Sequence, residues 1–543
     1  MNVKPLLQHI NPDTFIIDYL KANGVKDIER YLVPDDGCFD NPWDYLGMLD
    51  AVELVHRHIR NNSKIGVVMD ADQDGVCSAA IVYLFLKTFN ITPNIFVHAG
   101  KQHGINDLLP QILSANLDLL IIPDAGTNCV DECRELRENN IDAVCFDHHE
   151  VEKDNPYALV INHHLGGEFG HNLNTALSGA GVTYQFVRAY CDKYKLKCPD
   201  YYDIVAVSIV SDICDLTPLE SRAFIDRGLN HPSNPFLSLL FEKKCKRRGV
   251  TPEGISWDVA PLGNALARVD DQDTKLLFFD ALVGNIPYDK ALTDISRVKR
   301  KQDEAVKAVV EELEPILDTS NKCIIGFTEA ANKDFIGLIA NKFTGKYKKP
   351  TVLLRELNST TYSGSLRSPI PLADVINQSK LAKCQGHLSA CGCLVKKSNL
   401  KRFQQFLESL DLSCDPDIEV AGEISPKNIT RKLCEDIQDN KILWGKGLPN
   451  PQFYVKMDVN SSQVQIFKKN TNTIKLTIND VDFIKFFADD KDITNFSKPD
   501  FTIEMIVELS TNEWNGVVSP QAIIKDYEIV EDEDKDLDWE DLF

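Results

Sequence analysis

Short apolar runs alternate with helical patterns in the first part of the chain. Helical patterns over residues 79–89 and 128–139 separate apolar runs that have the length of buried strands. These runs span residues 65–69, 119–123, 143–146 and 158–161. Such alternation predicts a parallel sheet flanked by helices. In sheets of this kind ligands bind beyond the carboxyl ends of the strands, and an aspartate directly follows each of the first three runs.

A second alternating region follows a helical stretch. Residues 179–229 have a mostly helical pattern, and residues 288–317 predict one long connecting helix. A helix from Ile336 onward stands among further strand-like runs, which predicts a second α/β unit. These runs span residues 322–327, 350–354 and 361–366.

Short strands separated by turn signals fill the region from about residue 415 to residue 525, and residues 463–467 and 473–478 are two of them. This pattern predicts a small β-barrel. The expected fold class is therefore α/β, with two α/β domains joined by a long helix and followed by a β-barrel. The expected domains are a helical lead-in (1–60), a first α/β domain (61–230), a helical connector (231–317), a second α/β domain (318–412), the barrel (413–525) and an acidic tail (526–543).

The composition is that of a soluble globular protein, with 43% hydrophobic and 26% charged residues. No apolar run approaches the roughly 18–20 residues that span a bilayer, and the N-terminus lacks the apolar core of a secretion signal. The 15 cysteines include no C-x-x-C pair, which favours free thiols in a reducing compartment. We therefore expect a cytoplasmic monomer without a membrane segment.

The net charge of −22 argues against a nucleic-acid partner when taken alone. The charge is unevenly distributed, because residues 526–543 hold ten acids and one lysine. Three basic clusters lie elsewhere: Lys243, Lys244, Lys246, Arg247 and Arg248; Arg297, Lys299, Arg300 and Lys301; and Lys342, Lys346, Lys348 and Lys349. The first of them can be a solvated helix end or a DNA contact, and net charge does not decide between the two.

Asp70, Asp72 and Asp74 follow the first apolar run in the sequence VVMDADQDG. Three alternate carboxylates repel one another unless cations offset their charge. Hard oxygen ligands of this kind suit Mg²⁺ or Mn²⁺. A calcium-type loop or a solvated turn has the same pattern, so this cluster alone leaves the choice open.

Three further sites carry acidic or imidazole side chains. Asp124 follows the second apolar run, where a lone aspartate is commonly a helix cap. The sequence DHH at residues 147–149 ends the third run, and imidazole favours Mn²⁺, Zn²⁺ and similar metals. Asp212 lies in an otherwise apolar helical stretch and needs a partner if it is buried. Asp215 is a competing candidate three residues later.

These four sites, in this order, make a far more specific signal than any one of them, and together they resemble the DHH phosphoesterase superfamily. Further segments resemble the RecJ branch of that superfamily, its DHH-associated domain and the start of an OB-fold. These segments are NPWDYLGMLDAVELVHRHIRNNSKIGVVMDADQDG, VAPLGNALARVD, DFIGLIANKFTGKYKKPTVLL, SGSLRS, QGHLSACG and WGKGLPNPQF. The resemblance covers roughly residues 25–480, and the compact, acidic form of the chain is compatible with a phage version of the family.

The resemblance implies a DHH domain with a parallel sheet, a DHH-associated domain and an OB-fold. It implies a metal-dependent exonuclease that degrades single-stranded DNA from 5′ to 3′ into 5′-mononucleotides, in DNA repair, recombination or replication. Two alternatives stay open. One is a DHH phosphodiesterase acting on short oligonucleotides or cyclic dinucleotides, which is typically shorter and lacks the barrel. The other is a catalytically silent replication scaffold, against which the retained metal ligands argue.

The resemblance also implies roles for single residues. Two divalent cations, Mn²⁺ or Mg²⁺, would be held by Asp70, Asp72, Asp74, Asp124, His148 and Asp212, with Asp124 as the bridge. The residues implied to act in catalysis are His149, Asp147 and His387. Contacts to DNA or to a terminal phosphate would come from Arg268, Asn264, Ser365, Arg367, Lys101, His103 and Phe453.

The chain departs from the family pattern at three positions. Ala125 replaces the asparagine that commonly follows the second aspartate, and Gln385 replaces the first glycine of a Gly-Gly-His signature. His98 stands where the family often places an arginine for the 5′ phosphate. Lys101 and His103 are the candidates to substitute for that arginine.

Two other sets of residues each allow two interpretations. Three histidines can form a zinc site or a polar surface near the DNA, and their lack of zinc-finger spacing favours the surface. Three aromatic residues of the barrel can stack on bases, as in OB-folds, or form its core. The histidines are His163, His164 and His171, and the aromatic residues are Phe453, Tyr454 and Phe467.

The acidic tail ends in EDEDKDLDWEDLF, with a terminal Phe543. It can be a disordered solubilising tail. Its tip also resembles the acidic C-terminal peptide of single-strand DNA-binding proteins, in which a terminal aromatic and nearby acids dock in a basic pocket. This resemblance implies binding to replication or single-strand-binding proteins, or to the basic groove of the chain itself.

Overall fold

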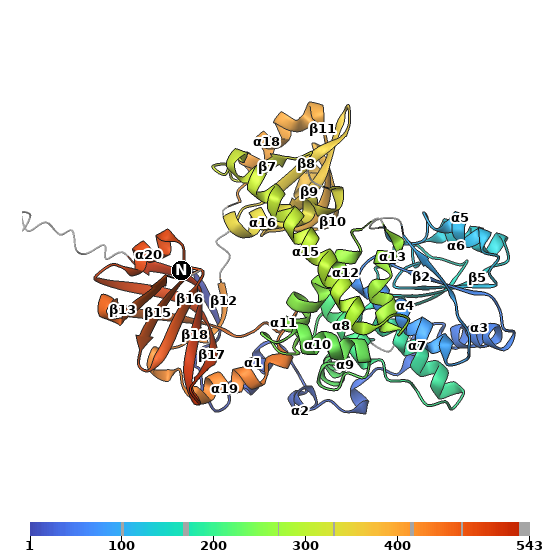
Figure 1. Cartoon of the computed structure of the whole chain (residues 1–543), viewed down its shortest axis with the longest axis horizontal. Coiled ribbons are helices and arrows are strands. Elements are labelled where there is room, and N and C mark those ends of the chain that lie inside the picture. The colour runs from blue at the N-terminus through green and yellow to red at the C-terminus, as the bar shows by residue number, and fades with distance from the viewer. Residues whose placement is uncertain are drawn as a thin grey trace, which may run out of the picture.

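The computed structural model describes residues 1–98, 102–166, 173–269, 271–329, 332–412, 418–468 and 471–530 of the chain. Figure 1 shows three lobes: one from blue to green on the right, a yellow one at the top, and a red one on the left that also holds the N-terminus. Each lobe contains one β-sheet. The α/β fold class expected from the sequence is confirmed.

The first lobe is built on five parallel strands in the order β3-β2-β4-β5-β6. They are β2 (Ile65–Met69), β3 (Asn94–Val97), β4 (Leu119–Pro123), β5 (Asp142–Asp147) and β6 (Leu159–Asn162). All residues of β2 and β4 are buried, as in central strands of a sheet covered on both faces. The four strands predicted from apolar runs are confirmed. The additional strand β3 lies at the sheet edge and begins with exposed Asn94, so its apolar signal is weak.

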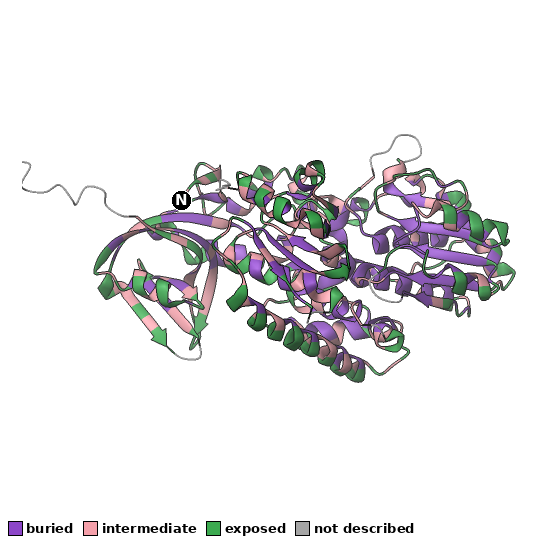
Figure 2. Ribbon diagram, turned by 90° about the horizontal axis from the view of Figure 1, so that it is seen from above, coloured by how far each residue is buried: buried purple, intermediate pink, exposed green. Residues whose placement is uncertain are grey.

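Helices cover both faces of this sheet and enclose a separate apolar core on each side. One layer comprises α3 (Met48–Arg60), α4 (Gln73–Lys87) and α7 (Gly179–Lys193). The other comprises α5 (Leu109–Ser114) and α6 (Val130–Glu138). Figure 2 shows the strands of this lobe in purple, as buried, between helices whose outer faces are green.

A helical connector leads out of the first lobe. It comprises α8 (Tyr202–Ser211), α9 (Leu219–Asn230), α10 (Pro235–Lys244), α11 (Pro252–Gly254), the π-helical turn η5 (Ile255–Val259), α12 (Ala260–Leu266), α13 (Gln272–Lys275) and α14 (Leu277–Leu282). The predicted connecting helix is α15 (Tyr288–Leu313), whose 26 residues span about 39 Å and reach the second lobe (Figure 1). Among the helices of the described ranges, none combines the length and the apolar character that crossing a membrane requires.

The second lobe contains a mixed sheet in the order β10-β11-β9-β8-β7. Its strands are β7 (Ile324–Phe327), β8 (Thr351–Asn358), β9 (Thr361–Arg367), β10 (Ala382–His387) and β11 (Ala390–Lys396). The helices are α16 (Ile336–Tyr347), α17 (Ala373–Ser379) and α18 (Leu400–Ser409). The end of α15 and α16 cover one face, and α17 and α18 cover the other. The predicted second α/β unit is therefore present.

The third lobe contains a strongly curved eight-stranded sheet (Figure 2) in the order β1-β12-β13-β17-β18-β16-β15-β14. Its strands are β1 (Val3–Leu7), β12 (Ile418–Glu423), β13 (Gln452–Asn460), β14 (Val464–Lys468), β15 (Asn472–Ile478), β16 (Val481–Phe486), β17 (Asp500–Trp514) and β18 (Val517–Val530). Helices α1 (Phe15–Ala22), α2 (Ile28–Leu32), α19 (Arg431–Asp439) and α20 (Asp490–Phe496) accompany it.

The two ends of the chain correct the predicted organisation. The lead-in is not purely helical, because β1 pairs in parallel with β12. The N-terminal amine also lies 2.7 Å from Glu504 Oε2 and from Glu528 Oε2. The run VKPLL is short and contains a proline, and its partner strand lies about 400 residues away, so no local pattern reveals it. At the other end, residues 526–530 belong to β18 rather than to a tail, and the rest of the acidic segment lies outside the described residues.

Candidate active site

Aspartates and histidines from several loops meet at the carboxyl edge of the first sheet. Asp70 and Asp72 follow β2, Asp124 follows β4, and residues 147–149 lie at the end of β5. Asp212 comes from the C-terminal end of α8. Because β2, β4 and β5 are parallel neighbours, their ends deliver residues far apart in sequence to one place.

Asp74 is almost completely buried in the first turn of α4. The backbone N–H groups of Gly179 (2.7 Å) and Ala180 (2.9 Å), at the start of α7, donate to its carboxylate. The hydroxyl groups of Ser78 and Ser208 donate to it as well. The unpaired N–H groups of a helix N-terminus stabilise a carboxylate, so α7 fixes the position of Asp74.

Asp124 has a left-handed backbone conformation (φ 63°), which is uncommon for residues other than glycine. Its N–H donates to the carbonyl of Phe146 at 2.7 Å. Gly179 leaves room for it, because a Cβ atom at that position would lie 2.5 Å from Asp124 Oδ1. Sequence reasoning missed Gly179. The available signal was the run of small residues SGAG at 178–181, where α7 begins.

Asp147 lies beneath the site rather than in it. The N–H groups of Thr127 (2.9 Å), His148 (2.8 Å) and His149 (3.2 Å) donate to its buried carboxylate, which also lies 2.8 Å from His149 Nδ1. Burial alone would raise the pKa of Asp147, but the bonds from His149 and Thr127 outweigh it and hold that pKa well below its usual range. Asp147 is therefore a positioning residue for His149, which corrects its predicted direct role in catalysis.

Three overlapping groups of side chains could each hold a metal ion. Within each group the ligand atoms lie within 4.8 Å of one another. The groups are Asp70, Asp72 and Asp124; Asp74, His148 and Asp212; and Asp124, His148 and His149. Asp124 and His148 each belong to two groups, and His148 Nε2 lies 3.2 Å from Asp124 Oδ1. The structure therefore brings all six predicted metal ligands together. Asp124 is shared by the group that contains Asp70 and Asp72 and the group that contains His148 and His149.

The site carries more negative charge than the protein around it offsets. Burial, and then the charges of Asp74 and Asp72, raise the pKa of Asp124 well above its ordinary value. Burial and the charge of Asp74 raise the pKa of Asp212 to about 6. Asp70 Oδ1 and Asp124 Oδ1 are buried and accept no hydrogen bond from any described residue. Such carboxylate oxygens fit a pair of divalent cations, which supply the missing positive charge.

His103 and His98 lie on either side of Asp70. His103 Nδ1 lies 3.1 Å from Asp70 Oδ2, and its side chain is half exposed. Burial opposes the charged form of His103, but the bond to Asp70 outweighs it and raises the pKa. His98 is completely buried, and its Nδ1 lies 2.8 Å from Asp107 Oδ1. Of the two predicted substitutes for the family arginine, His103 therefore reaches the site, and Lys101 lies outside the described residues.

A cavity of about 170 Å³ opens beside the metal ligands. Asp72, Asp74 and Asp212 line one side of it, and Asn264 and Arg268 line the other. Asn264 lies in α12, and Arg268 lies just beyond that helix. The two predicted DNA-binding residues of the connector thus line the same cavity as three of the predicted metal ligands.

The second lobe brings Arg367 and Ser365 towards this cavity. Arg367 donates to Ser365 Oγ at 2.6 Å, and its guanidinium lies over Gly337, where a Cβ atom would be 2.5 Å from Arg367 Nη2. Burial lowers the pKa of Arg268, with Asp334 opposing this shift and the like charge of Arg367 adding to it. The two arginines, from different lobes, are thus close enough to repel each other.

His387 shares a sheet face with Arg367. His387 pairs with Ala390 on β11, and Ala390 pairs with Arg367 on β9. Side chains of directly paired residues point to the same face, so the exposed His387 is on the side of the sheet that carries the arginine.

Phe453 is not a DNA contact. Its side chain is fully buried in the third lobe, and its ring lies 5.2 Å from that of Phe15. Alternation along β13 places it on the inner face of the curved sheet, which corrects its predicted role. Tyr454 is also buried, whereas Phe467 is 46% exposed.

The three clustered histidines supply no metal site among the described residues. His163 is buried, and burial lowers its pKa to about 3. His164 Nε2 lies 3.9 Å from Glu150 Oε1, and neither histidine belongs to a group that could hold a metal ion. His171 lies outside the described residues. Asp215 also lies outside these groups, and it accepts hydrogen bonds from the N–H and hydroxyl of Thr217.

Comparison with known families identifies two parts of the chain. Residues 64–209 match the model of the DHH family, N-terminal domain, and residues 420–526 match the model of the RecJ OB domain. The chain therefore contains a DHH-family N-terminal domain and a RecJ-type OB domain. The predicted metal ligands, apart from Asp212, fall in the first match, and most of the curved sheet of the third lobe falls in the second.

Several known proteins are similar to this chain over most of its length. It is 27% identical to a Bacillus subtilis (strain 168) protein named as an SPbeta prophage-derived single-strand DNA-specific exonuclease, YorK, over 95% of this chain and 96% of that one. It is 22% identical to the single-stranded-DNA-specific exonuclease RecJ of the same strain, over 99% of this chain and 71% of that one. The solved structure of RecJ in complex with Mn²⁺ from Thermus thermophilus superposes with a TM-score of 0.76 at 20% identity, covering 98% of this chain and 79% of that one. That likeness extends the shared fold to all three lobes.

Asp212→Asn should raise the melting temperature of the metal-free protein at pH 8. Because the folded-state pKa of Asp212 is raised to about 6, its ionisation costs stability, and this cost grows between about pH 4 and pH 6 and is complete above that range. Asparagine removes this cost, so the advantage over wild type should shrink as the pH falls below about 6 and vanish near pH 4. Added Mn²⁺ should stabilise the wild type more than the variant. Thermal melts in EDTA and in Mn²⁺ at both pH values measure these differences.

Asp215→Asn is the matched control, because Asp215 lies three residues away and outside the ligand groups. It should keep a Mn²⁺-induced shift of wild-type size. An Asp212→Asn variant with an undiminished Mn²⁺ shift would contradict the assignment of Asp212 as a ligand.

Proposed function

We propose that this chain is a metal-dependent exonuclease that hydrolyses single-stranded DNA from the 5′ end and releases 5′-mononucleotides. The observation that carries the proposal is Asp124, shared between two ligand groups beside the cavity that Asn264 and Arg268 line. The names of the relatives, single-strand DNA-specific exonucleases, support the same substrate. A place in repair, recombination or replication stays a prediction.

Six residues would hold two divalent cations, Mn²⁺ or Mg²⁺: Asp70, Asp72, Asp74, Asp124, His148 and Asp212. When bound, such a pair generates hydroxide near neutral pH and offsets charge on the phosphate oxygens. The protein contributes fixed positions for the ligands. The N-terminus of α7 holds Asp74, and the absence of a side chain at Gly179 admits Asp124.

His149 would donate a hydrogen bond to a phosphate oxygen of the substrate. Burial opposes its charged form, but the hydrogen bond to Asp147 and its charge outweigh burial and raise the pKa of His149 to about 9. The ring of His149 lies beside Asp124 and His148, and its hydrogen bond to Asp147 favours the protonated form. A protonated imidazole cannot ligate a metal, and as a donor it stabilises the charge that develops on the phosphate during hydrolysis.

Arg268 from the connector and Arg367 with Ser365 from the second lobe would hold the 5′-terminal phosphate. Two nearby guanidinium groups repel each other unless an anion lies between them, and each can bind a phosphate bidentately. His387, on the same sheet face as Arg367, would add a further donor. A grip on the terminal phosphate beside the cations favours attack at the first phosphodiester bond, which is the 5′ polarity proposed.

The third lobe would add affinity for longer strands. Phe467 and Phe486 are both 46% exposed, and each pairs with Thr473, so their rings lie on one face of neighbouring strands. Exposed aromatic rings on an OB-fold can stack on unpaired bases. An enzyme for cyclic dinucleotides would not need this surface, which favours a long substrate over that alternative.

A role of the acidic tail in binding replication or single-strand-binding proteins stays a prediction, because the described residues end at Val530. A pull-down that compares the full chain with one lacking Leu542 and Phe543 would test it. Equal recovery of partners by both would leave the tail as a charged appendage.

Asp124→Ala should abolish cleavage and leave binding of single-stranded DNA largely intact. Asp124 belongs to two of the ligand groups. Its loss should therefore weaken binding of both proposed cations, which supply the attacking hydroxide. Turnover of a 5′-labelled strand with Mn²⁺ and affinity for the same strand are measured on one preparation. Residual turnover within about tenfold of wild type would refute the two-metal assignment, since loss of a shared ligand should cost far more.

Arg367→Ala should reduce turnover on strands with a 5′ phosphate more than on strands with a 5′ hydroxyl. A lost charge-assisted contact is worth about 1.5–3 kcal/mol, or roughly 10- to 150-fold. Arg355→Ala, in β8 of the same sheet, is the matched control and should discriminate between the two ends as the wild type does. Equal losses on both strands in Arg367→Ala would show that Arg367 does not recognise the terminal phosphate.

A further inference from the structure

Two basic clusters that are about 50 residues apart in sequence lie side by side in the structure. Lys243 and Lys244 at the end of α10, and Arg297 and Arg300 on α15, line one groove of about 580 Å³. Asp289 is the single acid among the residues that line it. A locally basic groove on a chain of net charge −22 indicates a site for a polyanion. We call it the α10–α15 groove.

The cations of the α10–α15 groove are held by weak local interactions that a phosphate can replace. Arg297 pairs with Asp294 and Arg300 with Glu304 (3.8 Å), on successive turns of the same helix. Lys244 Nζ donates to the hydroxyl of Ser296 at 2.8 Å. Exposed ion pairs of this kind contribute about 0–1 kcal/mol each, so exchange of an acid for a phosphate costs little.

The third basic cluster differs in this respect. Lys349 Nζ donates to the carbonyls of Thr319 (2.8 Å) and Asn321 (2.9 Å), and Lys346 pairs with Glu314 across two helices. These side chains brace the second lobe internally. The cations that line the α10–α15 groove, Lys243, Lys244, Arg297 and Arg300, come from the first two clusters.

An exposed aromatic ring lies next to the first cluster. Trp257, in the π-helical turn η5, is 66% exposed, and the guanidinium of Arg248 lies 5.7 Å from its ring centre. Arg248 is itself held by Asp258 Oδ1 at 2.7 Å and by Glu253 Oε1 at 3.5 Å. A large apolar ring that is left in water beside a fixed guanidinium is a surface suited to stacking.

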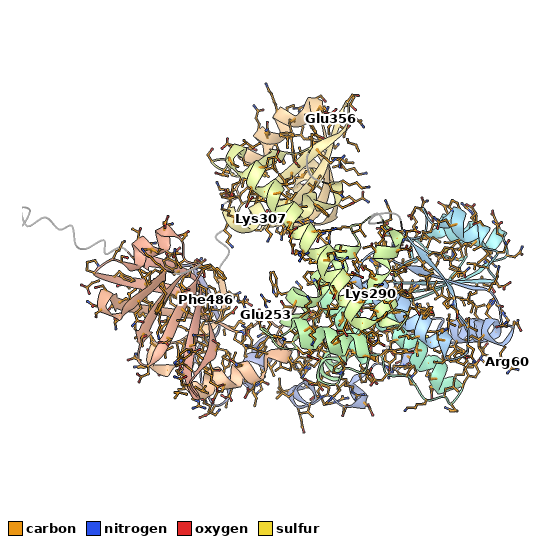
Figure 3. The ribbon with its side chains drawn as sticks, viewed as in Figure 1. Arg60, Glu253, Lys290, Lys307, Glu356 and Phe486 are labelled. Atoms are coloured by element: carbon orange, nitrogen blue, oxygen red, sulfur yellow. The ribbon has the colours of Figure 1, made fainter. Side chains whose placement is uncertain are left out.

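The turn that carries Trp257 lies between the α10–α15 groove and the catalytic cavity. It packs against α10, which leads into the groove, and against α8 and α12, which carry Asp212 and Asn264. Glu253, four residues before Trp257, is labelled in Figure 3 on the side of the first lobe that faces the third lobe. A strand that leaves the cavity towards the third lobe would therefore pass this turn.

We propose that Trp257, Arg248 and the cations of the α10–α15 groove bind the single-stranded DNA that lies beyond the nucleotides in the catalytic cavity. A base stacks on Trp257, and backbone phosphates contact Lys244, Arg297 and Arg300. The proposal rests on the proposed function and adds a strand-binding site outside the metal centre and outside the third lobe. Single-stranded rather than duplex DNA is inferred because only an unpaired base presents a free face to the ring.

Binding of a fluorescently labelled 20-nucleotide strand to the metal-free protein tests the proposal without any cleavage. Trp257→Ala should weaken binding by about fivefold or more, the loss of one base-stacking contact, and Trp257→Phe should restore part of it. The double variant Arg297→Ala, Arg300→Ala should lower the slope of log K against log salt by about 1.4, since each phosphate contact on a single strand contributes about 0.7. Intrinsic fluorescence should be quenched by the strand in the wild type and less so in Trp257→Phe.

Lys307→Ala is the matched control, because Lys307 is an exposed cation on α15, labelled in Figure 3, outside the groove. It should keep both the wild-type affinity and the wild-type salt slope. Thermal melts of all variants should agree with wild type within a few degrees, which separates lost contacts from lost folding.

Three outcomes would overturn the proposal. One is an affinity of Trp257→Ala within twofold of wild type together with an unchanged salt slope in the arginine double variant. Another is an equal loss of affinity for duplex and single strands in Trp257→Ala. The third is a wild-type dimer that Trp257→Ala converts to a monomer, which would mean that a second copy covers this face. Failure of the proposed function is distinguishable, because it would appear as a wild type that binds the strand but does not cleave it with Mn²⁺.

Discussion

Repulsion among the aspartates at the edge of the first sheet is the constraint on which the rest of the site depends. Burial and neighbouring charges raise the pKa values of Asp124 and Asp212, so the ionised cluster is unstable on its own. The fold offsets part of this charge by aiming the N-terminus of α7 at Asp74. It also buries Asp147 away from the cluster, where His149 neutralises it. The remaining negative charge requires cations. Binding of metal ions would therefore also stabilise the folded arrangement of the aspartates.

Positive charges also lie close to one another in this site, on two arginine side chains. Arg268 and Arg367 come from different lobes, and the charge of Arg367 adds to burial in lowering the pKa of Arg268. A phosphate between them would relieve this repulsion, so substrate binding and the approach of the two lobes would be coupled. The 26-residue helix α15 sets the separation of these lobes, and the same helix carries Arg297 and Arg300 into the α10–α15 groove. The helix α15 therefore both sets the distance between the lobes that carry Arg268 and Arg367 and supplies two cations to the proposed path of the strand.

Much of this architecture could be predicted from the sequence, because central parallel strands are apolar throughout and end in the residues that bind ligands. The runs that became β2 and β4 were found in this way. The set of six predicted metal ligands came from the resemblance to the DHH superfamily, and the structure places these residues together. Gly179 was missed because its role, leaving space for Asp124, arises from a contact between segments 55 residues apart that no local pattern records. Phe453 was misassigned because alternation along a strand does not say which face is inside. The convergence of Lys244 with Arg297 likewise depends on the packing of α10 against α15.

The N-terminal strand shows why the third lobe is best studied by substitution rather than by deletion. Phe15 and Tyr19 of α1 are buried in the core of this lobe, and Tyr19 packs edge-on against Trp444 at 5.9 Å. Tyr31, a few residues later, donates to the carbonyl of Leu216, shortly after the proposed metal ligand Asp212. A chain ending near residue 412 would expose the apolar face of α1 and release strand β1. Any loss of activity in such a chain would combine lost DNA contacts with a disturbed connector, whereas substitution of exposed Phe467 or Phe486 leaves this core intact.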